Sequence, residues 1–207
     1  MLIIKTSPNC AENLLLVGLN KVQRQYLKQE YNRAALGHQR LEGIFSHELY
    51  HQLRKIQEDN FQDVIGCEDN VFKKIVINMT LPKHIYPIGN NHCIDNINTN
   101  RTIPDIVFHE GQNTVSKQML VGEIKMKGVN FPLILTDLQK LIYYKVSNLN
   151  FENAVFIYTG LKSTLEEKLV IGLSTQMLGC LIKNNIVIAL QEKQKNKSIW
   201  NIYEFKK

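Results

Sequence analysis

The sequence predicts an α/β fold in which a mixed β-sheet is flanked by helices. Helical periodicity dominates the first part of the chain, a hairpin of two apolar segments follows, and helices then alternate with strands. The chain has 207 residues, of which 44% are hydrophobic and 21% charged, as in ordinary globular proteins. This length is enough for one full core, so we interpret residues 1–207 as a single domain with a helical N-terminal segment at 1–40.

The elements before the hairpin are predicted to be mostly helical. Residues 12–36 mix apolar side chains with basic and amide ones and indicate one or two helices. Residues 41–57 indicate a better-defined helix, because their apolar side chains fall on one stripe at about 100° per residue. β-branched residues at 74–79 then predict a strand, which ends before Pro82.

Two strand-like segments in the middle of the chain predict a β-hairpin. Residues 103–110 and 118–126 are largely apolar, and the turn residues at 111–116 join them. The hairpin gives the predicted sheet its antiparallel part.

Two matches to the capping-box pattern predict helix starts in the second half of the chain. Residues 136–139 would open a helix that runs to about Val146, and residues 163–166 would open another. Further strands are predicted at 154–158, 186–191 and 198–205.

Charge and cysteine content narrow the classes of function. The net charge of +6 favours an anionic partner such as nucleic acid, because Lys and Arg attract phosphate. The four cysteines lie far apart without a Cys-x-x-Cys pair, so we expect neither a disulfide scaffold nor a thiolate zinc site, and a cytoplasmic location fits best. No segment has the apolar length of a signal peptide or a membrane span, so no membrane partner is expected.

The predicted hairpin brings two carboxylates and a lysine together. A turn centred on Thr114 places Asp105 opposite Glu123, with Cβ atoms about 5 Å apart, and alternation puts Lys125 on the same face. Two neighbouring carboxylates repel one another unless a cation or a proton lies between them. The pattern is therefore typical of metal-assisted phosphodiester hydrolysis, in which an ammonium group helps to orient water. An ordinary amphipathic hairpin with a solvated polar face is the alternative.

Pro104-Asp105 and Glu123-Ile124-Lys125 resemble the signature of the PD-(D/E)xK nuclease superfamily, which includes restriction and repair nucleases. The resemblance spans residues 41–160, which would form the catalytic core. It implies a restriction-endonuclease-like mixed sheet, Mg²⁺ as cofactor with Mn²⁺ as a substitute, and DNA as the usual substrate. Many small nucleases of this kind form homodimers, so a homodimer is an option here as well.

The resemblance also implies roles for individual residues. Asp105 and Glu123 would hold the metal, with the Ile124 carbonyl as a further ligand, and Lys125 would position the attacking water. Members often carry an acidic residue on an upstream helix, for which Glu48 is the candidate accessory ligand or base.

Gln139 and Tyr143 are candidate accessory residues. They resemble the Gln-x-x-x-Tyr element of the RecB-like branch and share a helix face through their i, i+4 spacing. Gln139 also fits the predicted capping box, and Tyr143 also fits a core position, so both interpretations stay open.

A second motif offers a different function. Residues 47–51 read HELYH and match HExxH, the signature of zinc metallopeptidases. In that alternative His47 and His51 bind zinc and Glu48 activates water. The helical wheel turns Glu48 towards the apolar stripe and both histidines away from it, which favours the nuclease. A third alternative is a catalytically silent DNA-binding or assembly module on the same fold.

Overall fold

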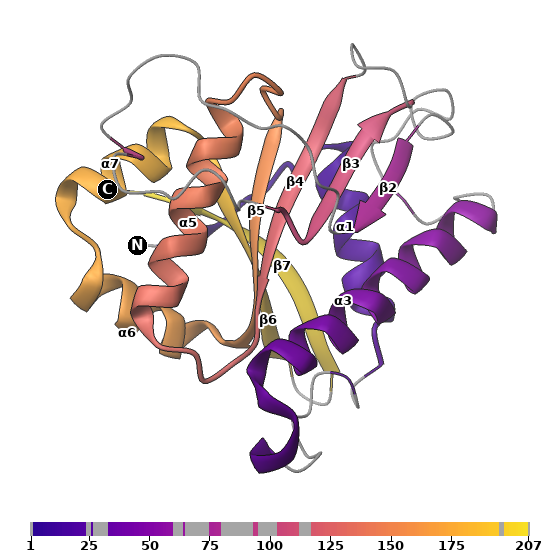
Figure 1. Cartoon of the computed structure of the whole chain (residues 1–207), viewed down its shortest axis with the longest axis horizontal. Coiled ribbons are helices and arrows are strands. Elements are labelled where there is room, and N and C mark those ends of the chain that lie inside the picture. The colour runs from indigo at the N-terminus through magenta and orange to yellow at the C-terminus, as the bar shows by residue number, and fades with distance from the viewer. Residues whose placement is uncertain are drawn as a thin grey trace.

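A computed structural model describes residues 2–23, 26, 33–59, 64, 75–79, 93–94, 103–111, 117–194 and 197–206. Its helices and strands are, in chain order, β1 (Leu2–Ile4), α1 (Cys10–Lys21), α3 (Arg33–Glu58), β2 (Ile75–Met79), β3 (Ile106–Glu110), β4 (Gln118–Lys125), α5 (Phe131–Lys145), β5 (Asn153–Leu161), α6 (Lys162–Gly172), α7 (Thr175–Lys183), β6 (Ile186–Gln194) and β7 (Lys197–Phe205). The α/β class and the mixed sheet flanked by helices are confirmed (Figure 1).

Among the described residues, seven strands form one sheet at the centre of the molecule, in the order β1-β7-β6-β5-β4-β3-β2. Strands β4, β5 and β6 run parallel to one another, and all other neighbours are antiparallel. The parallel strands are apolar on both sides because helices cover both faces of the sheet. β4 has two roles in the sheet: it is the second strand of the predicted hairpin, antiparallel to β3, and it is parallel to β5 on its other side.

The helices form two layers (Figure 1). α5 connects β4 to β5, and α6 with α7 connects β5 to β6, as crossovers between parallel strands require. These three helices cover one face, and α1 and α3 cover the other. Each layer has its own buried core, which includes Leu138 and Phe156 on the α5 side and Leu14 and Leu49 on the α3 side.

The predicted start of α5 is wrong. The helix begins at Phe131, since the Asn130 side chain caps it by accepting a hydrogen bond from Leu133 N at 3.3 Å. Thr136, the predicted cap, lies inside the helix, where its hydroxyl donates to Pro132 O at 2.9 Å. The helix therefore gains a turn before Asp137.

Other predicted elements exist with different ends. α6 begins at Lys162 without a side-chain cap, so the capping box at 163–166 is also wrong as a helix start. The predicted helix at 41–57 lies within α3, and every predicted strand is present. Residues 1–40 are not wholly helical, because β1 lies there and pairs with β7.

The cysteines depart from expectation. Cys93 and Cys180 form a disulfide across 87 residues of sequence, and Cys10 is also disulfide-bonded. The prediction was wrong because it rested on spacing along the chain, whereas folding brings Cys93 onto α7. Persistent disulfides are typical of oxidising compartments, so the cysteines no longer support a cytoplasmic location, which stays a prediction. Among the described helices, none combines the length and the apolar character needed to cross a bilayer.

Candidate active site

The β3–β4 hairpin has the predicted register at its open end. Ile106 pairs with Gly122, and Asp105 N donates a hydrogen bond to Gly122 O at 3.1 Å. The register of the two strands shifts nearer the turn, between Phe108 and His109. Asp105 lies one residue before this ladder, and its carboxyl group is a charged neighbour of Glu123; the predicted direct pairing of the two residues stays a prediction.

Asp105 is held in place by the backbone of β4. Its Oδ2 accepts a hydrogen bond from Ile124 N at 2.7 Å, whereas no described residue donates to its Oδ1. Burial raises the pKa of Asp105, although the Ile124 hydrogen bond opposes this change. One oxygen is thus fixed by the backbone, and no described donor holds the other.

Glu123 is a carboxylate buried between β4 and α5, with 1% of its surface exposed. Tyr144 Oη donates to its Oε1 at 2.8 Å, and Lys140 Nζ lies 3.4 Å from its Oε2. Burial raises the pKa of Glu123 well above its usual range, and the neighbouring charges of Asp105 and Asp137 raise it further. A positive charge beside Glu123, in addition to that of Lys140, would favour its ionised form and offset much of the free energy that burial and the two neighbouring carboxylates cost it.

Lys125 is the positive centre at the end of β4. Its Nζ lies 3.1 Å from Glu42 Oε2 and 3.0 Å from Asp137 Oδ2, and donates to the carbonyl of Ile124 at 3.4 Å. Burial alone would lower the pKa of Lys125, but Asp137 and Glu42 outweigh that effect and raise it. Both carboxylates favour the charged form of Lys125, which suits charge stabilisation better than the role of a base.

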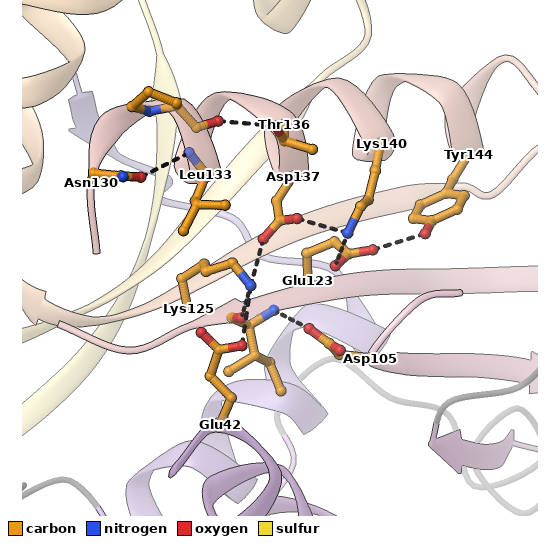
Figure 2. Close-up of polar contacts among 12 residues, drawn as sticks. Glu42, Asp105, Glu123, Lys125, Asn130, Leu133, Thr136, Asp137, Lys140 and Tyr144 are labelled. Atoms are coloured by element: carbon orange, nitrogen blue, oxygen red, sulfur yellow. Dashed lines mark hydrogen bonds and ion pairs between the residues drawn. The ribbon is translucent and has the colours of Figure 1, made fainter. Parts of the chain in front are cut away.

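α5 supplies three polar side chains that the sequence analysis did not single out. Asp137, Lys140 and Tyr144 follow i, i+3, i+7 spacing and share one helix face, which points at Glu123 and Lys125 (Figure 2). Lys140 Nζ is 2.8 Å from Asp137 Oδ1. The sequence feature that could have identified these three residues is a set of polar side chains on a helix face that is otherwise apolar and buried.

The charged groups alternate in sign along one continuous chain of contacts (Figure 2). Successive contacts of 3.1, 3.0, 2.8 and 3.4 Å connect Glu42, Lys125, Asp137, Lys140 and Glu123. The alternation ends at Glu123, whose next charged neighbour is another carboxylate, Asp105. At that end, two carboxyl groups approach one another, and Glu123 is buried whereas Asp105 is half-buried.

The candidate accessory residues on α5 lie one position away from the site face. Tyr143 is fully buried in the core, and Gln139 is half-buried, whereas Lys140 and Tyr144 contact Glu123. Lys140 and Tyr144, each one residue after Gln139 and Tyr143, thus have the same i, i+4 spacing and face the site.

The acidic residue that α3 supplies to Lys125 is Glu42 and not Glu48. Glu48 lies later on the helix, on a different side, and accepts a hydrogen bond from Gln52 Nε2 at 2.8 Å. His47 and His51 are exposed on the same helix, as the wheel predicted. Within the described ranges, no three His, Cys, Asp or Glu side chains are grouped so that they could hold a metal ion as they stand.

No family model, curated protein or solved structure matches this chain. Its function is therefore inferred from the residues of the site.

A cavity of about 430 Å³ lies away from these residues, between β1, β7, α6 and α7. Its lining is mostly apolar, with Glu166 and Glu167 as its acidic members. It contains none of the charged side chains of the hairpin site.

Proposed function

We propose that this chain is a Mg²⁺-dependent deoxyribonuclease with a restriction-endonuclease-like fold. The observation that carries the proposal is the approach of two carboxylates, half-buried Asp105 and buried Glu123, at the end of an otherwise alternating chain of charges. A divalent cation between them would continue the alternation, and it would offset both the burial that raises the pKa of each group and the charge of Asp105 that raises the pKa of Glu123 further.

The donor set fits a hard cation. Carboxylate and carbonyl oxygens are the ligands that Mg²⁺ and Mn²⁺ prefer, and they disfavour the softer zinc. Asp105 Oδ1, which accepts no hydrogen bond from a described residue, and a Glu123 oxygen would hold the ion, with the Ile124 carbonyl beside them. When bound, Mg²⁺ supplies Lewis-acid chemistry that activates water and polarises a phosphodiester.

The remaining side chains support that reaction. Lys125 stays protonated and would stabilise negative charge that develops on the phosphate, while Glu42 and Asp137 hold its ammonium group in position. Tyr144 fixes the orientation of Glu123 through its hydrogen bond. The substrate class follows from the resemblance to PD-(D/E)xK nucleases, and the net charge of +6 is consistent with a polyanionic partner.

A cleavage assay tests the proposal. Plasmid and linear DNA are incubated with the wild type, Asp105→Asn and Asp59→Asn, in Mg²⁺, Mn²⁺ or EDTA. The wild type should cut with either metal and not in EDTA. Loss of a residue that only supports a metal ligand lowers activity by roughly 10- to 100-fold. Asp105→Asn changes a proposed ligand itself, so its rate of cleavage should fall by more than that. Asp59, exposed beyond α3, is the matched control and should change nothing.

Each alternative predicts a different result. DNA binding without cleavage in any divalent metal would support the silent module. One zinc per purified chain, lost in His47→Ala, would support the peptidase. Equal cleavage by Asp105→Asn and the wild type would place the active site elsewhere.

A further inference from the structure

Lys140 lies where a cation would bridge two carboxylates. Its Nζ is 2.8 Å from Asp137 Oδ1 and 3.4 Å from Glu123 Oε2 (Figure 2). Both partners are almost completely buried, at 2% and 1% exposed. In two-metal hydrolases, ions about 3.5 to 4 Å apart share carboxylate ligands in this way.

The charges of the site leave room for one divalent ion. Among the described residues, the acidic side chains of the site are Glu42, Asp105, Glu123 and Asp137. The described basic side chains are Lys125 and Lys140, so that with every group ionised the described site carries two more negative than positive charges. A single divalent cation would neutralise them, whereas a second would leave an excess of positive charge in a buried place.

The ammonium group of Lys140 is also difficult to displace. Asp137 Oδ1 would lose its contact, and a buried carboxylate without compensation is costly. On Glu123, Tyr144 engages Oε1 and Lys140 engages Oε2, which leaves this carboxylate fewer lone pairs for metal ions.

We propose that Lys140 is a built-in counter-ion that takes the place of a second metal ion, so that the site binds one divalent cation per chain. The inference rests on the proposed function, because it concerns the same carboxylates. Lys140 is in this sense a positioning residue: it neutralises Asp137 and Glu123 and confines the single ion to the Asp105 side of the site.

Counting Mn²⁺ on the metal-free full chain tests the proposal without measuring activity. Calorimetry and electron paramagnetic resonance are applied to the wild type, Lys140→Gln, Lys140→Arg and Lys145→Gln. Lys145 is the matched control, because it lies on the same helix and donates to the Glu152 carbonyl at 2.6 Å, outside the charge network. We expect one ion per chain in the wild type, Lys140→Arg and Lys145→Gln, and two in Lys140→Gln, whose hyperfine-split signal should weaken because neighbouring ions couple.

Two results would overturn the inference. The first is that the wild type binds two ions per chain. The second is that Lys140→Gln binds a single ion with the same affinity as the control variant Lys145→Gln. Thermal unfolding shows whether each variant is folded, and Lys140→Met, which keeps the length of the side chain, replaces Lys140→Gln if that variant is not. One bound ion with no cleavage of DNA would leave the role of Lys140 in place and remove the proposed nuclease. No bound ion in any variant would overturn both.

Discussion

Glu123 is buried and has two acidic neighbours, Asp105 and Asp137, so its ionisation should make the stability of the metal-free protein depend on pH. Its pKa lies well above its ordinary value of 4.5, so the folded chain binds this proton more tightly than the unfolded chain. The stabilisation from that proton is complete below pH 4.5 and is lost as the pH rises through the raised pKa. Asp105 acts in the same direction, because its pKa is also raised.

Glu123→Gln should remove this pH dependence. The substituted amide keeps the shape of the side chain but does not ionise, so the variant should gain stability over the wild type as the pH rises above 4.5 and through the raised pKa of Glu123, without divalent metal. Thermal unfolding in EDTA across that range measures the difference. A difference in melting temperature that stays constant with pH would show that Glu123 titrates normally. Added Mg²⁺ should raise the melting temperature of the wild type alone.

Individual residues of the site divide into those that local pattern predicts and those that it does not. Asp105, Glu123 and Lys125 lie in one hairpin, where alternation and a turn position are enough to place them on one face. Glu42 and Lys140 come from helices on opposite faces of the sheet, and their approach to β4 depends on how each helix packs. No spacing rule connects residues whose proximity is set by packing, so the sequence predicts Glu48 and Gln139 where the structure brings Glu42 and Lys140 to β4.

At the scale of elements, the contact between β3 and β4 sets the distance between Asp105 and Glu123, the two carboxylates that we propose bind the metal. Gly122 permits that contact, because a Cβ atom there would lie 2.6 Å from Ile106 Cγ2. Ile106 directly follows Asp105. A larger residue at position 122 would therefore push the start of β3, and the carboxylate before it, away from Glu123.

Gly122→Ala should cost about 1 to 3 kcal/mol of stability, the usual penalty for overpacking, and should also lower cleavage. Gly179→Ala is the control: a methyl group at this position inside α7 would meet nothing within 4 Å, so the change should stabilise by roughly 0.5 to 1 kcal/mol. Urea denaturation and the cleavage assay compare the two. Gly122→Ala with wild-type stability and cleavage would show that β3 has room to adjust.

α5 shows why the ends of elements were harder to predict than their existence. The Thr136 pattern matched a capping box, but a four-residue motif also occurs by chance inside helices. Asn130 followed by Pro132 carries the actual start, since a capping amide and a proline in the first turn act together. The earlier start sets the helix turn on which Asp137 lies.

At the scale of the whole molecule, the disulfide between Cys93 and Cys180 connects the segment before β3 to α7. It closes 87 residues of chain, which in the chain-entropy account corresponds to roughly 4 to 5 kcal/mol of stabilisation. Cys93→Ala/Cys180→Ala should lower the free energy of unfolding by up to that amount. Reductant alone is a poorer test, because Cys10 is also disulfide-bonded.

Denaturation of the double variant and the wild type under non-reducing conditions measures the loss. Alkylation of the intact wild type followed by mass spectrometry shows whether Cys93 and Cys180 are paired. An unchanged unfolding midpoint in the double variant would contradict the expectation. The sequence could not supply this connection, because cysteine spacing carries no information about distances between elements far apart in the chain.

The pairing of Leu2 with Phe205 has a consequence for the order in which the molecule is built. During synthesis, β1 leaves the ribosome long before β7 exists, and contacts of large sequence separation form slowly. The β3–β4 hairpin, by contrast, needs only neighbouring residues and can close early. The nascent chain therefore brings Asp105 next to Glu123 while one edge of its sheet is still open to aggregation.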